Sequence, residues 1–208
     1  MSQFNRQRVK DGVQQLGLTV TDTQVEQWIR CLQLIHSANE NVNLTAIREP
    51  DAMIDKHLLD SLTVVPWLSG QTIVDLGTGG GFPGLPLAIF FPDKQFILVD
   101  SIAKKIKVVQ AVATQLGLQN VRTEVARGES LKGVAADTVV ARAVASLSDL
   151  GRYARNLTKS GGQLLAMKGR LDEAEMADLP KGFKLVAVKK VMVPGLSDER
   201  HLVRFIRA

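Results

Sequence analysis

The sequence predicts an α/β fold in which a mostly parallel sheet follows a group of N-terminal helices. Three observations predict this class. From residue 71 onward, short apolar runs alternate with segments of helical periodicity, a pattern typical of parallel sheets. One of the runs, 73–76, leads directly into a glycine-rich turn. The last two runs, 183–193 and 202–206, have no helix between them, which indicates a hairpin that adds an antiparallel edge.

The first third of the chain is predicted to be helical. A helix over 4–16 precedes a second one, at whose start both Thr21–Gln24 and Thr23–Glu26 match the capping-box pattern. A third begins at Pro50, and its apolar stripe consists of Ile54, Leu58, Leu62 and Val65. We expect residues 1–70 to form a helical cap on a core formed by residues 71–208, the two making one compact unit.

The core is predicted element by element from the same periodicities. Strands are expected at 73–76, 96–100, 120–125, 138–143 and 163–167, before the final hairpin. Helices are expected from Pro83, from Ala103, over 147–157 and, as a short acidic helix, over 171–178. The paired glycines 161–162 indicate a turn into the fifth strand.

The glycine-rich turn after the first strand indicates a nucleotide-type ligand. Gly79, Gly81 and Gly84 satisfy the dinucleotide pattern G-x-G-x-x-G, which is a weak signal when it stands alone. Asp75 closes the strand two residues before Gly77, the first glycine of the pair Gly77 and Gly79, as in the first motif of S-adenosylmethionine enzymes. The turn alone therefore favours a methyltransferase over a dehydrogenase, and leaves a Rossmann-like binding module as a third possibility.

Other candidate binding residues follow the later strands. Ligands of open parallel sheets bind beyond the carboxyl ends of the strands. Asp100 ends the second strand and is placed to accept hydrogen bonds from a ribose, which suits either cofactor. Gly128 and Glu129 are placed for an adenine edge, and Arg142 for a carboxylate of the cofactor or a phosphate of the substrate. Lys168 follows the fifth strand.

The charge distribution is compatible with a polyanionic partner. Residues 1–70 carry six basic and eight acidic side chains, whereas residues 71–208 carry twenty and thirteen. The excess positive charge thus lies on the half that contains the glycine turn, which suits RNA, although a solvated surface would look the same. Lys104, Lys105 and Lys107 are candidates for contacts with RNA phosphates.

Composition bounds the remaining possibilities. The single Cys31 excludes a disulfide framework within the chain and fits a reducing compartment. The N-terminus lacks the apolar core of a signal peptide, and no apolar run approaches the length of a membrane span. No cluster of residues has metal-ligand spacing. We expect a cytoplasmic, monomeric protein without a bound metal.

The absence of certain motifs narrows the chemistry. Methylation of a pyrimidine carbon needs a cysteine nucleophile, and Cys31 lies far in sequence from every strand end. The [DNS]-P-P-[YF] loop common in amine methylation is missing. His57, Asp60 and Ser61 share one helical turn, so a catalytic triad is not expected. Guanine N7 attacks without losing a proton, and these residues permit that reaction without singling it out.

Taken together, several segments resemble one family, the bacterial small-subunit ribosomal RNA guanine-N7 methyltransferases, also called glucose-inhibited division protein B. The matching segments run from the cap to the last strand: Asn43-Leu44-Thr45-Ala46, His57-Leu58-Leu59-Asp60-Ser61, Asp75 to Pro86, Leu98-Val99-Asp100-Ser101, Ala141-Arg142-Ala143, Met167-Lys168-Gly169 and Glu199-Arg200-His201-Leu202-Val203.

The resemblance implies a class I, Rossmann-like S-adenosylmethionine-dependent methyltransferase fold. It also implies transfer of a methyl group from S-adenosylmethionine to N7 of guanine 527 (RNA numbering) in the 530 loop of 16S ribosomal RNA, giving 7-methylguanosine. The partner would be this RNA, the small ribosomal subunit or an assembly intermediate. The implied cofactor contacts are Gly77, Phe82, the pair Gly128–Glu129 and Arg142, and the implied substrate side contains His57, Lys168, Arg200 and His201.

Two rival functions remain at this point. An NAD-dependent oxidoreductase would place a pyrophosphate on the glycine turn and would need a partner for hydride transfer, for which the sequence offers no candidate. A non-catalytic RNA-binding module would keep the basic surface without binding the cofactor.

Overall fold

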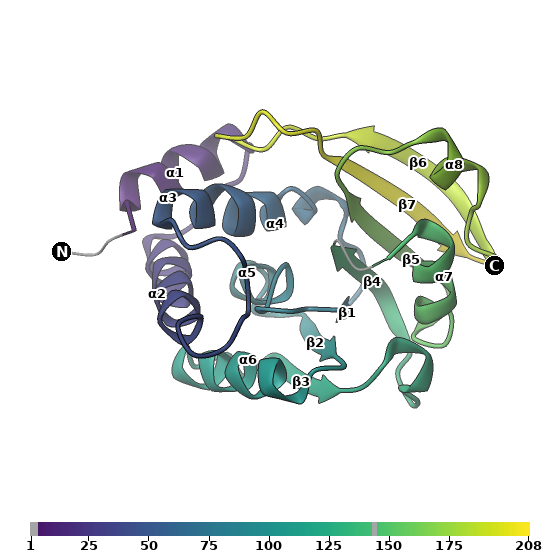
Figure 1. The fold of residues 1–208 in the computed structure, drawn as a ribbon, viewed down its shortest axis with the longest axis horizontal. Helices are drawn as coiled ribbons and strands as arrows, with labels where there is room; N and C mark the ends of the chain where they lie inside the picture. Colours follow the sequence, from purple (N-terminus) through teal and green to yellow (C-terminus); the bar gives the residue numbers. More distant parts are fainter. Residues whose placement is uncertain (1–3, 143–144) are drawn as a thin grey trace.

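The computed structural model describes residues 4–142 and 145–208 and contains one seven-stranded sheet (Figure 1). The strands are β1 (Thr72–Leu76), β2 (Gln95–Asp100), β3 (Val121–Val125), β4 (Ala136–Arg142), β5 (Thr158–Lys168), β6 (Phe183–Lys190) and β7 (His201–Arg207). Their order is β3-β2-β1-β4-β5-β7-β6. The first five run parallel, and β7 lies antiparallel between β5 and β6, which confirms the predicted C-terminal hairpin.

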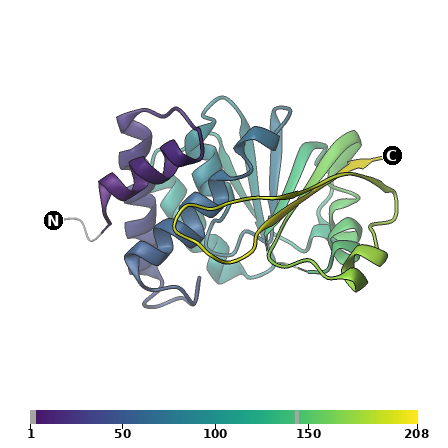
Figure 2. The same cartoon turned by 90° about the horizontal axis from the view of Figure 1, so that it is seen from above.

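Helices cover both faces of this sheet (Figure 2). They are α1 (Arg6–Gln15), α2 (Asp22–Ala38), α3 (Pro50–Met53), α4 (Asp60–Leu62), α5 (Gly84–Phe90), α6 (Ala103–Gln115), α7 (Leu147–Ala154) and α8 (Glu173–Ala177). Strand residues alternate between two apolar clusters, so that Ile73 packs with the cap, α5 and α6, whereas Val74 packs with α7. The result is a three-layer sandwich.

The N-terminal cap shares its apolar core with the sheet. Trp28 of α2 is fully buried, and its indole Nε1 donates to the carbonyl of Pro86 in α5 at 3.1 Å. Leu58 and Leu62 of the predicted apolar stripe lie in the same cluster as Ile73 of β1. Burial of these side chains is the driving force that fixes the cap on the core.

Most predicted elements are confirmed, and the differences have physical reasons. The fifth strand begins at Thr158 rather than after a glycine turn, because Gly161 adopts a φ of 73° inside an irregular stretch of the strand. Strand β6 ends at Lys190, before Pro194 and Gly195 redirect the chain. Ala143, the last residue of the predicted fourth strand, lies outside the described residues.

The third helix contains a widened turn that the periodicity did not predict. Between α3 and α4, residues Ile54–Leu59 form a π-helical turn, which is a rare geometry that frequently occurs at functional sites. Helix α1 packs tightly against it, because Gly12 has no side chain to collide with Leu59. The turn carries His57 and leads into Asp60.

The connection between β6 and β7 reaches from the hairpin to the N-terminal helices (Figures 1 and 2). Arg200 Nε lies 3.3 Å from Asp60 Oδ1, and Asp198 Oδ2 lies 3.9 Å from Lys56 Nζ. The last part of the chain therefore contacts the widened turn of the third helix.

Candidate functional site

The glycine turn joins β1 to α5 around a buried carboxyl group. Asp75 is fully buried, and its Oδ2 accepts from Thr78 Oγ1 at 2.6 Å and from the Gly84 amide at 2.7 Å. Its Oδ1 has no hydrogen-bond partner among the described residues. Burial raises the pKa of Asp75 to about 6. Asp75 thus holds both ends of the turn, Thr78 at its start and Gly84 at its end.

Three glycines give the turn its shape. Gly77, Gly79 and Gly81 have φ values of 74°, 56° and 92°, in the left-handed region that other residues rarely adopt. The amide of Gly79 donates to Asp100 Oδ2 at 2.9 Å, while Asp100 Oδ1 accepts from the Ile102 amide at 2.9 Å. Asp100 therefore links the turn after β1 to the turn after β2.

A pocket of about 400 Å³ opens above these turns, at the carboxyl ends of the strands. The structure brings together there six of the seven residues predicted to bind the cofactor: Gly77, Gly79, Asp100, Gly128, Glu129 and Arg142. A Cβ atom on Gly128 would lie 2.8 Å from Leu76 Cδ1 and 3.0 Å from the Tyr153 carbonyl, so only glycine keeps the backbone this close to the pocket floor.

Phe82, the seventh predicted residue, is buried next to this pocket rather than in its lining. Its ring stacks on the His57 imidazole at 4.6 Å between centroids, with 16° between the planes. The motif gave no signal for this orientation. The prediction from sequence also missed Tyr153, which lines the pocket from α7. Lys105, a candidate for contacts with RNA phosphates, lines this pocket as well.

A second pocket, also about 400 Å³, lies between the widened turn, β5 and the segment before β7. It is lined by Ile47, Lys56, His57, Asp60, Arg142, Met167, Lys168, Gly169 and Arg200. Three of the four predicted substrate-side residues, His57, Lys168 and Arg200, therefore meet here. His201 does not line it, and its Nδ1 lies 2.7 Å from the Gly169 carbonyl oxygen.

Arg142 lines both pockets. Its Nη1 donates to the Lys56 carbonyl at 2.7 Å and to Asp60 Oδ2 at 2.9 Å, and its Nη2 lies 3.4 Å from His57 Nδ1. A guanidinium has five N–H donors, and these contacts use three of them. Within the described residues, the remaining two, Nε–H and one Nη2–H, have no hydrogen-bond partner, and they form a fork that suits a carboxylate or a phosphate.

The second pocket is predominantly cationic. Four of its side chains are basic (Lys56, Arg142, Lys168 and Arg200) and one is acidic. That acid, Asp60, is 4% exposed and lies between Arg142 and Arg200. Glu175 pairs with Lys168 at 2.5 Å from outside the lining. The arrangement suits an anionic ligand held by arginine.

His57 is buried in a form that carries no charge at neutral pH. Burial and, next, the charge of Arg142 lower the pKa of His57 to about 3. Ser61 Oγ donates to the His57 main-chain carbonyl at 2.5 Å rather than to its ring, in agreement with the expectation that no catalytic triad is present. The geometry favours a positioning role for His57 over proton transfer.

This burial predicts a dependence of stability on pH. The unfolded chain protonates His57 near pH 6.5, whereas the folded protein does so only near pH 3, so stability falls as the pH drops through this window. Asp75 acts in the opposite direction, because its raised pKa lets the folded protein take up a proton first. We expect His57→Gln to remove the first effect alone.

Urea unfolding at pH 7 and pH 5 checks this expectation. The free energy of unfolding of the wild type should fall by about 2 kcal/mol relative to that of His57→Gln between the two values. Parallel pH profiles of the two proteins would show that His57 is already protonated, or exposed, in the folded state.

Three further findings concern the cysteine, metal ligands and membrane-spanning helices. Cys31 is buried, and burial raises the pKa of its thiol to about 12. Within residues 4–142 and 145–208, no group of three or more His, Cys, Asp or Glu side chains could hold a metal ion. Of the helices in that part of the chain, none combines the length and apolar character needed to cross a membrane.

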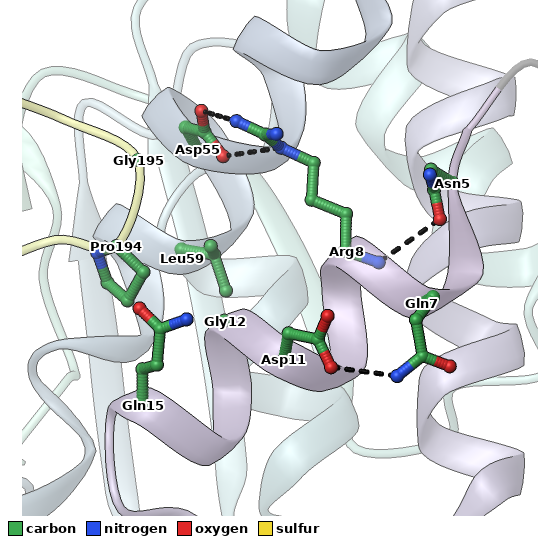
Figure 3. A pocket seen from close by; sticks show the side chains of 10 residues that line it. All are labelled: Asn5, Gln7, Arg8, Asp11, Gly12, Gln15, Asp55, Leu59, Pro194 and Gly195. Carbon is green, nitrogen blue, oxygen red and sulfur yellow. Dashed lines mark hydrogen bonds and ion pairs between the residues drawn. The ribbon is translucent and has the colours of Figure 1, made fainter.

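A third cavity, of about 360 Å³, lies away from the strand ends, between α1, the widened turn and residues 194–195 (Figure 3). Arg8 spans it with a fork on Asp55, the Nε–Oδ1 distance being 3.1 Å and the Nη2–Oδ2 distance 2.5 Å. Gly195 packs so closely that a Cβ would lie 2.5 Å from Asp55 Oδ2. Arg8 and Asp55 thus pair with each other, and this pair joins α1 to the third helix.

Comparisons with known proteins agree with this architecture. A family model described as rRNA small subunit methyltransferase G matches residues 24–203. Ribosomal RNA small subunit methyltransferase G of Aeromonas salmonicida (strain A449) is 46% identical over 200 residues, which cover 96% of each chain. The protein of the same name from Shewanella amazonensis is 39% identical over 203 residues, 97% of this chain and 98% of the relative.

Solved structures share the fold at low identity. A SAM-dependent methyltransferase from Aquifex aeolicus aligns with a TM-score of 0.57 at 15% identity, covering 85% of this chain and 98% of that one. The sheet order, the glycine turn and the pocket above it define a class I, Rossmann-like methyltransferase fold, as predicted. Within that class, the chain belongs to the GidB family, rRNA small subunit methyltransferase G.

Proposed function

We propose that this protein methylates 16S ribosomal RNA, transferring the methyl group of S-adenosylmethionine to N7 of guanine 527 (RNA numbering) in the 530 loop. The observation that carries the proposal is that Arg142 lines two pockets at once, one that contains six of the seven predicted cofactor-binding residues and one that is cationic. Relatives named for ribosomal RNA methylation support the substrate class.

The polar groups that line the first pocket suit S-adenosylmethionine. Asp100 at the end of β2 is placed for the ribose hydroxyls, and Gly128 with Glu129 for the adenine edge. Gly77 and Gly79 let the backbone approach the methionine part without a side chain in the way. The free fork of Arg142 would pair with the carboxylate of that part.

The second pocket supports a polyanionic substrate. Lys56, Arg142 and Arg200 are positioned to neutralise RNA phosphates near the reacting base. Lys168 donates to the Ala145 carbonyl at 2.9 Å, and this hydrogen bond fixes the Lys168 side chain at the edge of the second pocket. We propose that His57, Lys168 and Arg200 orient the substrate and that His201 supports the rim through Gly169.

Methylation of guanine N7 requires the protein to align the two substrates and does not require a general base. When bound, the sulfonium of S-adenosylmethionine supplies a methyl group that is open to attack by a nucleophile. The N7 lone pair of guanine forms the new bond, the carbon–sulfur bond breaks, and its electron pair remains on sulfur. Guanine N7 carries no proton, so no general base is required, and a neutral His57 is consistent with this.

The proposal is tested by nucleoside mass spectrometry of 16S RNA from cells with and without the gene, read fragment by fragment. We expect 7-methylguanosine to disappear from the 530-loop fragment and to return when purified protein and S-adenosylmethionine are added. An unchanged modification map would contradict the assigned substrate. Incubation with naked RNA, mature subunits and assembly intermediates in parallel would identify the form that is methylated.

The same proposal includes a cellular setting. Because small ribosomal subunits assemble in the cytoplasm, we propose that the protein acts there, as a monomer. Light scattering of the purified protein checks the second part, and a mass twice the 22.7 kDa of the chain would contradict it.

A further inference from the structure

The loop between α2 and α3 is fixed by one side chain. Asn39, which is 4% exposed, accepts at Oδ1 from the amides of Leu44 at 2.9 Å and Thr45 at 3.0 Å. Its Nδ2 donates to the Thr45 carbonyl at 2.9 Å. Thr45 is therefore held at both its amide and its carbonyl, and its side chain has a defined position.

The hydroxyl of Thr45 faces the imidazole of His57. Thr45 Oγ1 lies 2.8 Å from His57 Nε2 and also accepts from the Ile47 amide at 3.0 Å. On the other side of the ring, Nδ1 lies 3.4 Å from Arg142 Nη2. The ring thus lies between a hydroxyl, which can donate or accept, and a guanidinium, which can only donate.

This arrangement determines the tautomer of His57. Because a guanidinium can only donate, the contact between Arg142 Nη2 and Nδ1 is a hydrogen bond only when Nδ1 carries the lone pair, which puts the ring proton on Nε2. Nε2–H then donates to Thr45 Oγ1, so that the hydroxyl oxygen accepts two hydrogen bonds. The opposite tautomer would turn an N–H towards the guanidinium and push Arg142 away from Asp60.

We propose that Thr45 is a positioning residue whose hydroxyl accepts from Nε2–H of His57, stabilises this tautomer together with Arg142, and thereby holds Arg142 where it lines both pockets. This inference rests on the proposed function for its effect on turnover. Stacking of the His57 ring on Phe82 fixes the plane of the ring. The two tautomers share that plane, and they are distinguished by the donor at Nδ1 and the acceptor at Nε2.

Two variants separate the hydroxyl from the shape of the side chain. Thr45→Val keeps the branched shape without the oxygen, and Thr45→Ser keeps the oxygen without the methyl group. Thr158→Val is the control, because Thr158 is a buried threonine whose Oγ1 donates to the carbonyl of Ala154, a residue of the opposite apolar cluster, at 2.9 Å.

The tautomer is read directly from nitrogen–proton correlation spectra of the three histidines, His57 being assigned with His57→Gln. We expect the Nε2–H pattern in the wild type, in Thr45→Ser and in Thr158→Val, and its loss in Thr45→Val. A wild-type spectrum with the proton on Nδ1, or with a charged ring at pH 7, would overturn the inference without any variant.

Turnover gives the second readout. Thr45→Val is expected to lower kcat/KM for 16S RNA about tenfold, the loss of roughly one hydrogen bond, and Thr45→Ser is expected to restore most of it. Wild-type turnover in a folded Thr45→Val, or equal losses in both Thr45 variants, would overturn the positioning role. If the wild type itself methylates no RNA, the proposed function fails while the tautomer is still tested by the spectra.

Discussion

Replacing Arg142 by alanine is expected to lower kcat/KM for methylation of 16S RNA by about 100- to 1,000-fold, which corresponds to roughly 3–4 kcal/mol of transition-state stabilisation. The guanidinium contacts the Lys56 carbonyl in the widened turn and the carboxylate of Asp60 directly after it, and it lines both pockets. Its loss removes the free fork and leaves Asp60 with Arg200 as its remaining cationic partner. Transfer of a radiolabelled methyl group to the RNA measures the effect.

Two further variants make this experiment specific. Arg142→Lys keeps the charge without the fork and should recover only a minor part of the rate. Arg122→Ala removes an exposed arginine that pairs with Glu124 on β3, outside both pockets, and should leave the rate unchanged. Near-normal turnover in a folded Arg142→Ala protein would mean that Arg142 is only a structural ion-pair partner.

Loss of the Asp100 carboxylate is expected to weaken binding of S-adenosylmethionine about 100-fold without unfolding the protein. Asp100→Ala would remove both the proposed acceptor for the ribose and the acceptor that holds the Gly79 amide, and hydrogen bonds to a charged group contribute about 1.5–3 kcal/mol each. Gly77→Val should have a similar effect, because it places a branched side chain in the pocket at a φ of 74°.

Calorimetric titration with S-adenosylmethionine and with NAD checks this prediction and separates the rival cofactors. Matched controls are Asp93→Ala, at an exposed aspartate, and Gly117→Val, at a glycine with a φ of 69° and no atom within 4 Å of the added Cβ. Wild-type affinity in both Asp100→Ala and Gly77→Val would contradict the assigned pocket, and tight binding of NAD would favour the dehydrogenase alternative.

Features that depend on neighbouring residues were predictable from sequence. Asp75, the glycine turn and Asp100 follow consecutive parallel strands, so the rule for strand ends was enough to bring them together. Gly128 and Glu129 follow the next strand and meet the same pocket for the same reason. Their specific roles in binding remain predictions.

Features that depend on long-range pairing were not predictable. Arg142 and Asp60 are 82 positions apart, and their hydrogen bond joins the core to the cap, a contact that no local pattern encodes. The widened turn also left no trace in the apolar stripe, because Ile54, Leu58 and Leu62 remain buried across it. The stacking of Phe82 on His57 depends on that turn and was missed with it.

The widened turn has a consequence for the order in which the two pockets can form during synthesis. The cofactor pocket uses only residues 76–153, whereas the cationic pocket also needs Arg200, close to the end of the chain. The same turn is held on its other side by Arg8, close to the beginning. The cationic pocket therefore cannot be complete before Arg200 has been synthesised, and contacts between positions so far apart in sequence form late in folding.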